Sequence, residues 1–168
     1  MGAMSLQVSG RLNMRFGPKA TLLPSLVAIG LGLVLFAQAP VDGAYVTDIL
    51  PAMTLLGLGA GLGFPALMTL AMSGATPSDS GLASGLVNTS VQVGGAIGLA
   101  VLATFAGERT ANLQAAGVDH ASALNSGFHL AYLIGAVLVA AAIALSVIVF
   151  RQPRPERSRI GATATEAA

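Results

Sequence analysis

The most regular feature of the sequence is a set of four long apolar stretches separated by polar segments. The stretches cover residues 20–38, 49–74, 81–106 and 130–150, and none of them contains Asp, Glu, Lys or Arg. A transmembrane helix needs roughly 20 mainly apolar residues, whereas the strands of a membrane barrel alternate in polarity over about ten residues. Because these stretches are long and do not alternate, the pattern predicts four membrane-spanning helices.

Polar and helix-breaking residues mark the joints between the stretches. Segment 39–48 contains Pro, Gly and two Asp, and segment 75–80 is a short polar turn whose Ser or Asp suits the N-cap of the next helix. Segment 107–129 carries Glu, Arg, Asp and His, and we expect it to form a longer loop. Residues 151–168 are rich in Pro, Arg and small residues, which predicts a disordered tail.

Composition supports a membrane protein and excludes several other classes. The chain is 54% hydrophobic and 9% charged, against roughly 25% charged residues in ordinary soluble domains. Such a chain cannot cover a soluble surface with polar groups, and it has no basic face for nucleic acid. It has no cysteine, and its two histidines, His120 and His129, have no carboxylate cluster nearby. We therefore expect no catalytic residues, no metal site and no cofactor.

The positions of the cations predict the orientation of the helices. With four spans, the two chain ends and segment 75–80 lie on one side of the membrane, and seven of the eight Lys and Arg residues fall there; Arg109 alone lies opposite. Cationic loops stay cytoplasmic, so we expect both termini in the cytoplasm and the helices in the plasma membrane. A secretory signal peptide over residues 11–39 is an alternative, but its apolar run is long and three further spans follow.

Glycines in the second and third stretches are spaced for close helix packing. The small-xxx-small pairs are Gly57/Gly61, Gly59/Gly63, Gly81/Gly85 and Gly94/Gly98. Such pairs let helix backbones approach closely, and helix packing is favoured over direct ligand contact as their role. Pro51 and Pro65 in the second stretch each remove a backbone hydrogen bond, which predicts bends in that helix.

The third stretch also carries a polar face within the predicted membrane region. Ser84, Asn88 and Gln92 are spaced i, i+4 and i+8, and Thr89 lies beside them. Hydrogen-bonding side chains gathered on one helix face do not point toward lipid. Two interpretations remain open for these four residues: hydrogen bonds to another helix, which we favour, or the lining of a substrate path.

The absence of charge inside the four stretches limits the function of the chain by itself. A proton-driven transporter needs a titratable group near the membrane midplane to couple the movement of protons and substrate. None of the four stretches contains an acidic or basic residue. The chain alone therefore offers no site for proton coupling.

Two segments resemble one protein family. Residues 9–19 (SGRLNMRFGPK) are similar to the cytoplasmic-loop signature G-x-L-x-D-R-x-G-x-[KR] of the major facilitator superfamily, with Met14 in place of the Asp. The residues that match this signature are Gly10, Leu12, Arg15, Gly17 and Lys19. Residues 55–67 (LLGLGAGLGFPAL) and 79–104 (DSGLASGLVNTSVQVGGAIGLAVLAT) closely resemble late helices of the fourteen-span drug–proton antiporter branch. The second match rests on Asp79, Gly81, Ala83, Ser84, Gly85, Asn88, Thr89, Gln92, Gly94 and Gly95.

The resemblance implies an all-α membrane bundle in which residues 1–150 are the C-terminal four helices of a transporter domain and residues 151–168 are its cytoplasmic tail. It implies export of drugs or small metabolites in exchange for protons by alternating access. The implied partners are the lipid bilayer, a small-molecule substrate, protons and the N-terminal helices of the complete transporter. The proton-coupling acids of the family belong to its first half, so the resemblance assigns no catalytic residue here.

Two alternatives compete with a transporter portion. A truncated, non-transporting remnant or accessory membrane protein agrees with the missing first half and with the absence of charge in the spans. A small four-helix exporter that works as a dimer has a similar size, but such exporters depend on a membrane-embedded Glu in the first helix. Residues 20–38 contain no Glu, which disfavours the second alternative.

Overall fold

The computed structural model describes residues 17–76 and 78–151 of the chain, and within these ranges it contains long helices and no strand. Four of the helices are long and apolar enough to cross a membrane. The helical elements are α2 (Pro18–Phe36), the short π-helical turn η1 (Tyr45–Ile49), α3 (Leu50–Met72), α4 (Ser80–Ala115) and α5 (His120–Arg151). The prediction of an all-α membrane bundle is confirmed. Gly10, Leu12, Arg15 and the predicted tail beyond Arg151 lie outside the described residues.

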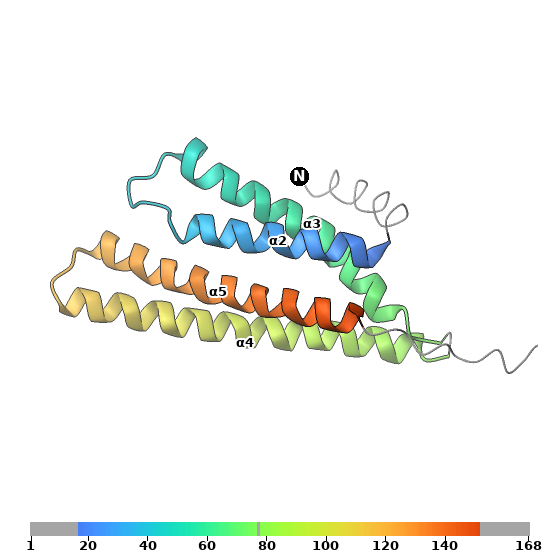
Figure 1. Ribbon diagram of the computed structural model, residues 1–168. Helices are drawn as coiled ribbons and strands as arrows, with labels where there is room; N and C mark the ends of the chain where they lie inside the picture. The colour runs from blue at the N-terminus through green and yellow to red at the C-terminus, as the bar shows by residue number, and fades with distance from the viewer. Residues whose placement is uncertain (1–16, 77, 152–168) are drawn as a thin grey trace, which may run out of the picture.

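The helices are arranged as two hairpins laid side by side (Figure 1). α2 and α3 form one hairpin, α4 and α5 form the other, and α5 lies against α2. α3 and α4 contact each other sparsely, close to the turn that joins them. The two hairpins are therefore held together mainly through α2 and α5.

The expectation of a long loop over residues 107–129 is wrong. α4 continues to Ala115 and α5 begins at His120, so only residues 116–119 lie outside helices. At 1.5 Å per residue, the 36-residue α4 is about 54 Å long, against a hydrocarbon thickness of roughly 30 Å. The charged segment continues the helix beyond the apolar stretch because Ala, Glu, Arg, Leu and Gln all favour helix formation. Charge marks the end of the apolar run and not the end of the helix.

The turn between α4 and α5 has well-defined capping geometry. Gly117 has a φ of +85°, and the N–H groups of Gly117 and Val118 donate to the carbonyls of Gln114 and Leu113, both at 3.0 Å. This is the Schellman pattern that commonly ends a helix at glycine. The carboxylate of Asp119 then accepts a hydrogen bond at 3.0 Å from the N–H of Ser122, which caps the first turn of α5. Two adjacent caps thus fix a tight hairpin.

Pro51 lies at the start of α3 and not in its middle. It follows the π-helical turn, in which the N–H of Leu50 donates to the carbonyl of Tyr45. Proline is tolerated in the first turn of a helix, where its missing N–H leaves no intrahelical bond unmade. Pro24 and Pro65 lie within α2 and α3. The predicted bend at Pro65 stays a prediction.

The most extensive helix packing occurs between α2 and α3. A Cβ atom added to Gly59 would lie 2.7 Å from the carbonyl oxygen of Ser25, and one added to Gly63 would lie 2.7 Å from the Ser25 hydroxyl. Ala52 and Ala66 of α3 are fully buried. The Gly59/Gly63 pair therefore has the packing role that its spacing predicted, because only glycine lets the two backbones approach this closely.

The two hairpins meet through aromatic and small residues. The rings of Phe36 in α2 and Tyr132 in α5 stack with their centroids 5.2 Å apart. Gly30 of α2 faces Val139, and Gly135 of α5 faces Leu33, each within van der Waals distance of a Cβ added to the glycine. Aromatic pairs of this geometry add stability beyond the area that they bury, and they give the bundle one well-defined seam.

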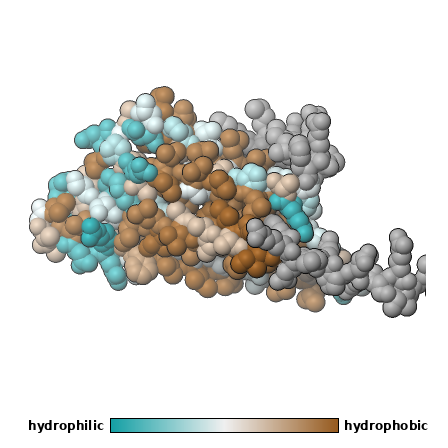
Figure 2. Space-filling model, in the orientation of Figure 1, coloured by the Kyte–Doolittle hydropathy of each residue, from teal (hydrophilic) through white to brown (hydrophobic). Residues whose placement is uncertain are grey.

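Large apolar side chains cover much of the outer surface. Figure 2 shows brown surface over the middle of the bundle, while teal and white gather at the end that carries the α2–α3 and α4–α5 connections. Leu82, Leu86 and Leu99 of α4 are among the most exposed of these side chains. In a membrane protein such a surface meets lipid or other helices, so the bundle matches the predicted location in a bilayer.

Candidate functional site

The four polar residues predicted on the third stretch lie in the first half of α4. All four side chains are exposed, and no residue of α4 is fully buried within the described structure. Ser84 and Asn88 line a hollow between α3 and α4, whereas Thr89 and Gln92 do not line it. The structure therefore places two of the four predicted residues together at a candidate site.

The hollow between α3 and α4 has a volume of about 380 Å³. Its other wall is formed by Phe64, Met68 and Met72 of α3, and Gly85 and Val87 complete the α4 side. The three α3 residues follow the i, i+4, i+8 spacing that places side chains on one helix face. These three residues were not among the candidates predicted from the sequence, although Ser84, Asn88 and Gln92 were identified by the same spacing.

Within the described residues, the polar stripe makes none of the interhelical hydrogen bonds that we favoured. No side-chain hydrogen bond joins Ser84, Asn88, Thr89 or Gln92 to another described helix. Ser84 and Asn88 instead line the hollow. A polar group inside a membrane needs a partner, so ligand, water or a further helix must supply one.

The glycines of α4 differ from those of α3. A Cβ atom added to Gly81, Gly85, Gly94, Gly95 or Gly98 would meet no atom of the described residues within 4 Å. Gly57 in α3 also has open space. The packing role predicted for Gly81/Gly85 and Gly94/Gly98 is thus not filled by the described part of this chain.

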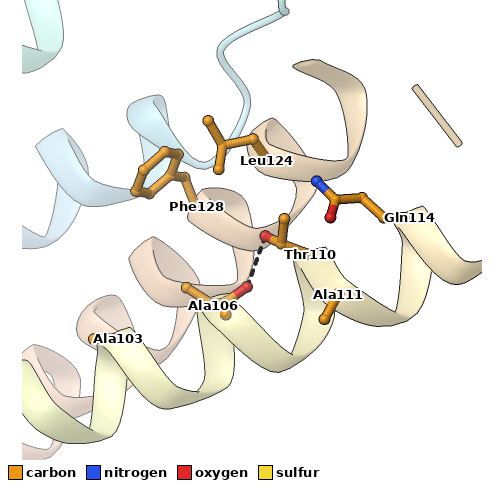
Figure 3. A pocket seen from close by; sticks show the side chains of 8 residues that line it. Ala103, Ala106, Thr110, Ala111, Gln114, Leu124 and Phe128 are labelled. Carbon is orange, nitrogen blue, oxygen red and sulfur yellow. Dashed lines mark hydrogen bonds between the residues drawn. The ribbon is translucent and has the colours of Figure 1, made fainter. Parts of the chain in front are cut away.

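A second hollow, of about 360 Å³, lies between α4 and α5. Figure 3 shows Leu124 and Phe128 of α5 on one side of it and Thr110 and Gln114 of α4 on the other. The Thr110 hydroxyl donates at 2.8 Å to the carbonyl of Ala106 one turn earlier. The lining is mostly Ala, Leu and Phe, so this hollow offers little beyond apolar contact.

Polar contacts between helices gather at the end of the bundle opposite the α3–α4 turn. His129 Nε2 lies 2.7 Å from the carbonyl oxygen of Ala39, and Asn125 Nδ2 donates to the same oxygen at 3.2 Å. Arg109 Nε donates to the Ser126 hydroxyl at 3.4 Å across the α4–α5 hairpin. His129 therefore has a structural hydrogen-bond partner at the seam between the two hairpins.

The Asp, Glu, Lys and Arg residues of the described ranges lie outside the four apolar stretches. Asp48 accepts a hydrogen bond at 2.8 Å from the N–H of Ala44, and Asp79 accepts one from the Thr76 hydroxyl in the α3–α4 turn. The hydrogen bond from Ser122 lowers the pKa of Asp119. In residues 17–76 and 78–151, no three His, Cys, Asp or Glu side chains lie together as metal ligands would.

The cytoplasmic-loop signature is described only at its end. Gly17 has a φ of +80° immediately before α2, a left-handed conformation that glycine adopts readily. Lys19 lies in the first turn of α2. The remaining signature residues, Gly10, Leu12 and Arg15, are outside the described ranges, so the site they were predicted to form stays a prediction.

Similar proteins agree on one family. The puromycin resistance protein pur8 of Streptomyces alboniger is 32% identical over 84% of this chain and 30% of its own length. The cephamycin export protein CmcT of Amycolatopsis lactamdurans is 40% identical over 64% of this chain and 22% of its own length. The drug efflux pump JefA of Mycobacterium tuberculosis is 33% identical over 62% of this chain and 20% of its own length. No solved structure gives a significant match.

These relatives are several times longer than the aligned region, and this chain spans less than a third of each. The family described as Major Facilitator Superfamily matches residues 1–167, nearly the whole sequence. Proteins of this family move solutes across membranes and are not enzymes, in agreement with the prediction that the chain carries out no covalent chemistry. With its four long apolar helices and this match, the chain belongs to the major facilitator superfamily of membrane transporters.

Proposed function

We propose that this chain is the C-terminal portion of an exporter that moves drugs or small metabolites across the plasma membrane in exchange for protons. The observation that carries the proposal is the open, uncharged polar face of α4, where Ser84 and Asn88 line a hollow without partners among the described residues. Thr89 and Gln92 lie on the same exposed half of the helix. Relatives named for resistance and export support the proposed activity.

Both termini lie in the cytoplasm in this proposal. Seven of the eight Lys and Arg residues belong to the chain ends, and the positive-inside rule assigns such segments to the cytoplasmic side. The α3–α4 turn then lies inside, and the His129 end of the bundle lies outside. Segments outside the described ranges carry most of these cations, so the orientation rests on sequence and not on structure.

Transport by alternating access requires helix bundles that move against each other. The open α4 face fits this requirement, because it leaves a polar and glycine-rich surface for the helices of the rest of the transporter. The coupling proton binds elsewhere in the complete protein, since the four apolar stretches contain no acidic or basic side chain. The partners are thus the bilayer, the substrate, protons and the N-terminal helices.

A chimaera tests the proposal directly. The segment of the Streptomyces alboniger relative that aligns with this chain is replaced by this chain, and puromycin resistance is measured in a sensitive host. We expect resistance to be retained, and we expect it to fall when Asn88→Leu removes the amide from the α4 face. A chimaera that reaches the membrane in the same amount as the parent but gives no resistance would contradict the proposal.

A non-transporting accessory role is the second candidate, and the missing intramembrane charge favours it. Proteoliposomes that contain only this chain and an imposed proton gradient separate the two candidates. Gradient-dependent efflux of an enclosed dye from these vesicles excludes the accessory role. The accessory role is supported if the vesicles show no dye efflux and the chimaera gives no resistance.

A further inference from the structure

The hollow between α3 and α4 has one adaptable apolar wall. Phe64 is 55% exposed, and Met68 and Met72 are half-buried beside it. Methionine is unbranched and polarizable, so it fits ligand shapes that a branched side chain would exclude, and its sulfur packs well against aromatic rings. Such a wall suits the flat face of an aromatic molecule.

The opposite wall of the hollow, on α4, carries two hydrogen-bonding side chains. Ser84 and Asn88 are one helical turn apart, and Gly85 next to Ser84 adds no side chain. The Asn amide offers two donor hydrogens and an acceptor oxygen, and the Ser hydroxyl can donate or accept. Since neither side chain bonds to another described residue, both groups are available to a ligand.

The electrostatics of the hollow select against charge. Its seven lining residues include no acidic or basic side chain. A charged group moved from water into such a site loses its hydration without gaining a counter-charge, which is far more costly than moving a neutral polar group that finds a hydrogen bond. The volume of about 380 Å³ falls within the range of ligand pockets, roughly 300–1,000 Å³.

We propose that this hollow is a binding site for an uncharged aromatic molecule that carries a hydrogen-bonding group. The ring packs on Phe64, Met68 and Met72, and the polar group bonds to Ser84 and Asn88. The inference rests on the proposed export function, because it names the chemistry of the exported molecule. In the proposed orientation the hollow lies next to the cytoplasmic α3–α4 turn, where an exporter takes up its substrate.

Because the chain contains no cysteine, an introduced cysteine is its single thiol in a thiol-protection experiment. Gly85→Cys places a single thiol in the hollow, where a Cβ atom would meet no described atom within 4 Å, and it leaves Ser84 and Asn88 in place. Leu86→Cys places one at the next residue of the same helix, at a side chain that is 67% exposed and does not line the hollow. Each variant is placed in lipid nanodiscs, and its rate of alkylation by N-ethylmaleimide is followed by mass spectrometry. The probes are Nile red, which is uncharged and aromatic, and the cation ethidium.

We expect Nile red at ten times its Kd to slow alkylation of the thiol at position 85 about tenfold, because only the unoccupied hollow reacts. The thiol at position 86 should keep its rate, and ethidium should protect neither. Met68→Ala in the Gly85→Cys background should weaken protection by Nile red. Circular dichroism checks that this variant keeps its helices.

Several results would overturn the proposal. Equal protection at positions 85 and 86 would show that the dye acts through the bilayer, and equal protection by ethidium would exclude selection for uncharged ligands. A thiol at position 85 that never reacts would show a closed hollow. Oxidative cross-linking of position 85 between two chains would show that a second copy covers it.

The outcome for this site is separable from the outcome for export. Protection at position 85 together with an inactive chimaera would uphold the binding site and reject the export function. Resistance from the chimaera without protection at position 85 would uphold export and reject this site.

Discussion

Two glycine-rich helix faces in this chain have the same sequence spacing and opposite structural roles. Gly59 and Gly63 of α3 press against Ser25 of α2, at distances that leave no room for a Cβ atom. Gly94 and Gly98 of α4 have the same small-xxx-small spacing and meet no described atom within 4 Å. The first face is closed by a partner within the chain, and the second is open. Glycine spacing therefore predicts that a close contact can form, but not which helix makes it.

The largest expected effect is at the closed face. Gly59→Leu would place a side chain onto the carbonyl of Ser25 and onto Ile29, and we expect it to lower the free energy of unfolding by about 3 kcal/mol through overpacking. Gly57→Leu is the matched control, because Gly57 has open space in the same helix. Replacing a helical glycine there should stabilise by up to about 1 kcal/mol. Unfolding in mixed micelles measures the free energy of unfolding of both variants. Equal losses of stability would show that position 59 is no more tightly packed than position 57.

A second closed contact lies in the other hairpin. A Cβ atom at Gly127 of α5 would collide with the Thr110 hydroxyl and lie 2.5 Å from the carbonyl of Ala106. We expect Gly127→Val to destabilise the α4–α5 hairpin by about 2 kcal/mol. The same unfolding assay measures the loss. An unchanged midpoint would show that α4 and α5 separate at little cost.

The seam between the hairpins depends partly on a polar contact. His129→Ala removes the bond to the Ala39 carbonyl, and we expect a loss of about 1 kcal/mol. His120→Ala is the control, because His120 is exposed and contacts Gln114 at the hairpin end. A double-mutant cycle with Asn125→Ala, which removes the second donor to the same oxygen, tests whether the two bonds act together. A larger loss of stability from His120→Ala than from His129→Ala would contradict a stabilising role for the contact between His129 and Ala39.

The open face should tolerate larger side chains within this chain. We expect Gly98→Val to change the free energy of unfolding of the isolated chain by less than about 0.5 kcal/mol, as surface substitutions usually do. In the chimaera with the longer relative, the same substitution should reduce resistance, because the face then meets other helices. A strong loss of stability in the isolated chain would show that the face is closed by the chain itself.

The smallest effect concerns pH at the α4–α5 turn. The hydrogen bond from Ser122 lowers the pKa of Asp119 below its ordinary value of 3.8. The native state therefore binds this proton more weakly than the unfolded state does, so the stabilisation is present above the ordinary pKa and is lost as the pH falls through the lowered value. Asp119→Asn should remove this part of the acid dependence of helicity, measured by circular dichroism. An unchanged acid profile would exclude Asp119 as the cap that titrates.

Much of the fold could be predicted from the sequence, because transmembrane helices depend on length and hydrophobicity alone. The error over residues 107–129 has a clear origin: charge ends a membrane span, whereas a helix ends where its caps form. Gly117 and Asp119 supply those caps. Of the four polar residues predicted from their spacing on α4, Ser84 and Asn88 line the hollow with α3, whereas Thr89 and Gln92 do not line it. Their role as a substrate path or a helix interface stays a prediction.

Four membrane-spanning helices and membership of a transporter family could be inferred from the amino-acid sequence, because hydrophobic length and local motifs carry that information. The packing of the helices was needed to show which glycines are in close contact, that Phe64, Met68 and Met72 line one hollow with Ser84 and Asn88, and that His129 bonds to the Ala39 carbonyl. These contacts join residues on different helices. Spacing along one helix defines a face, and only packing decides what that face meets.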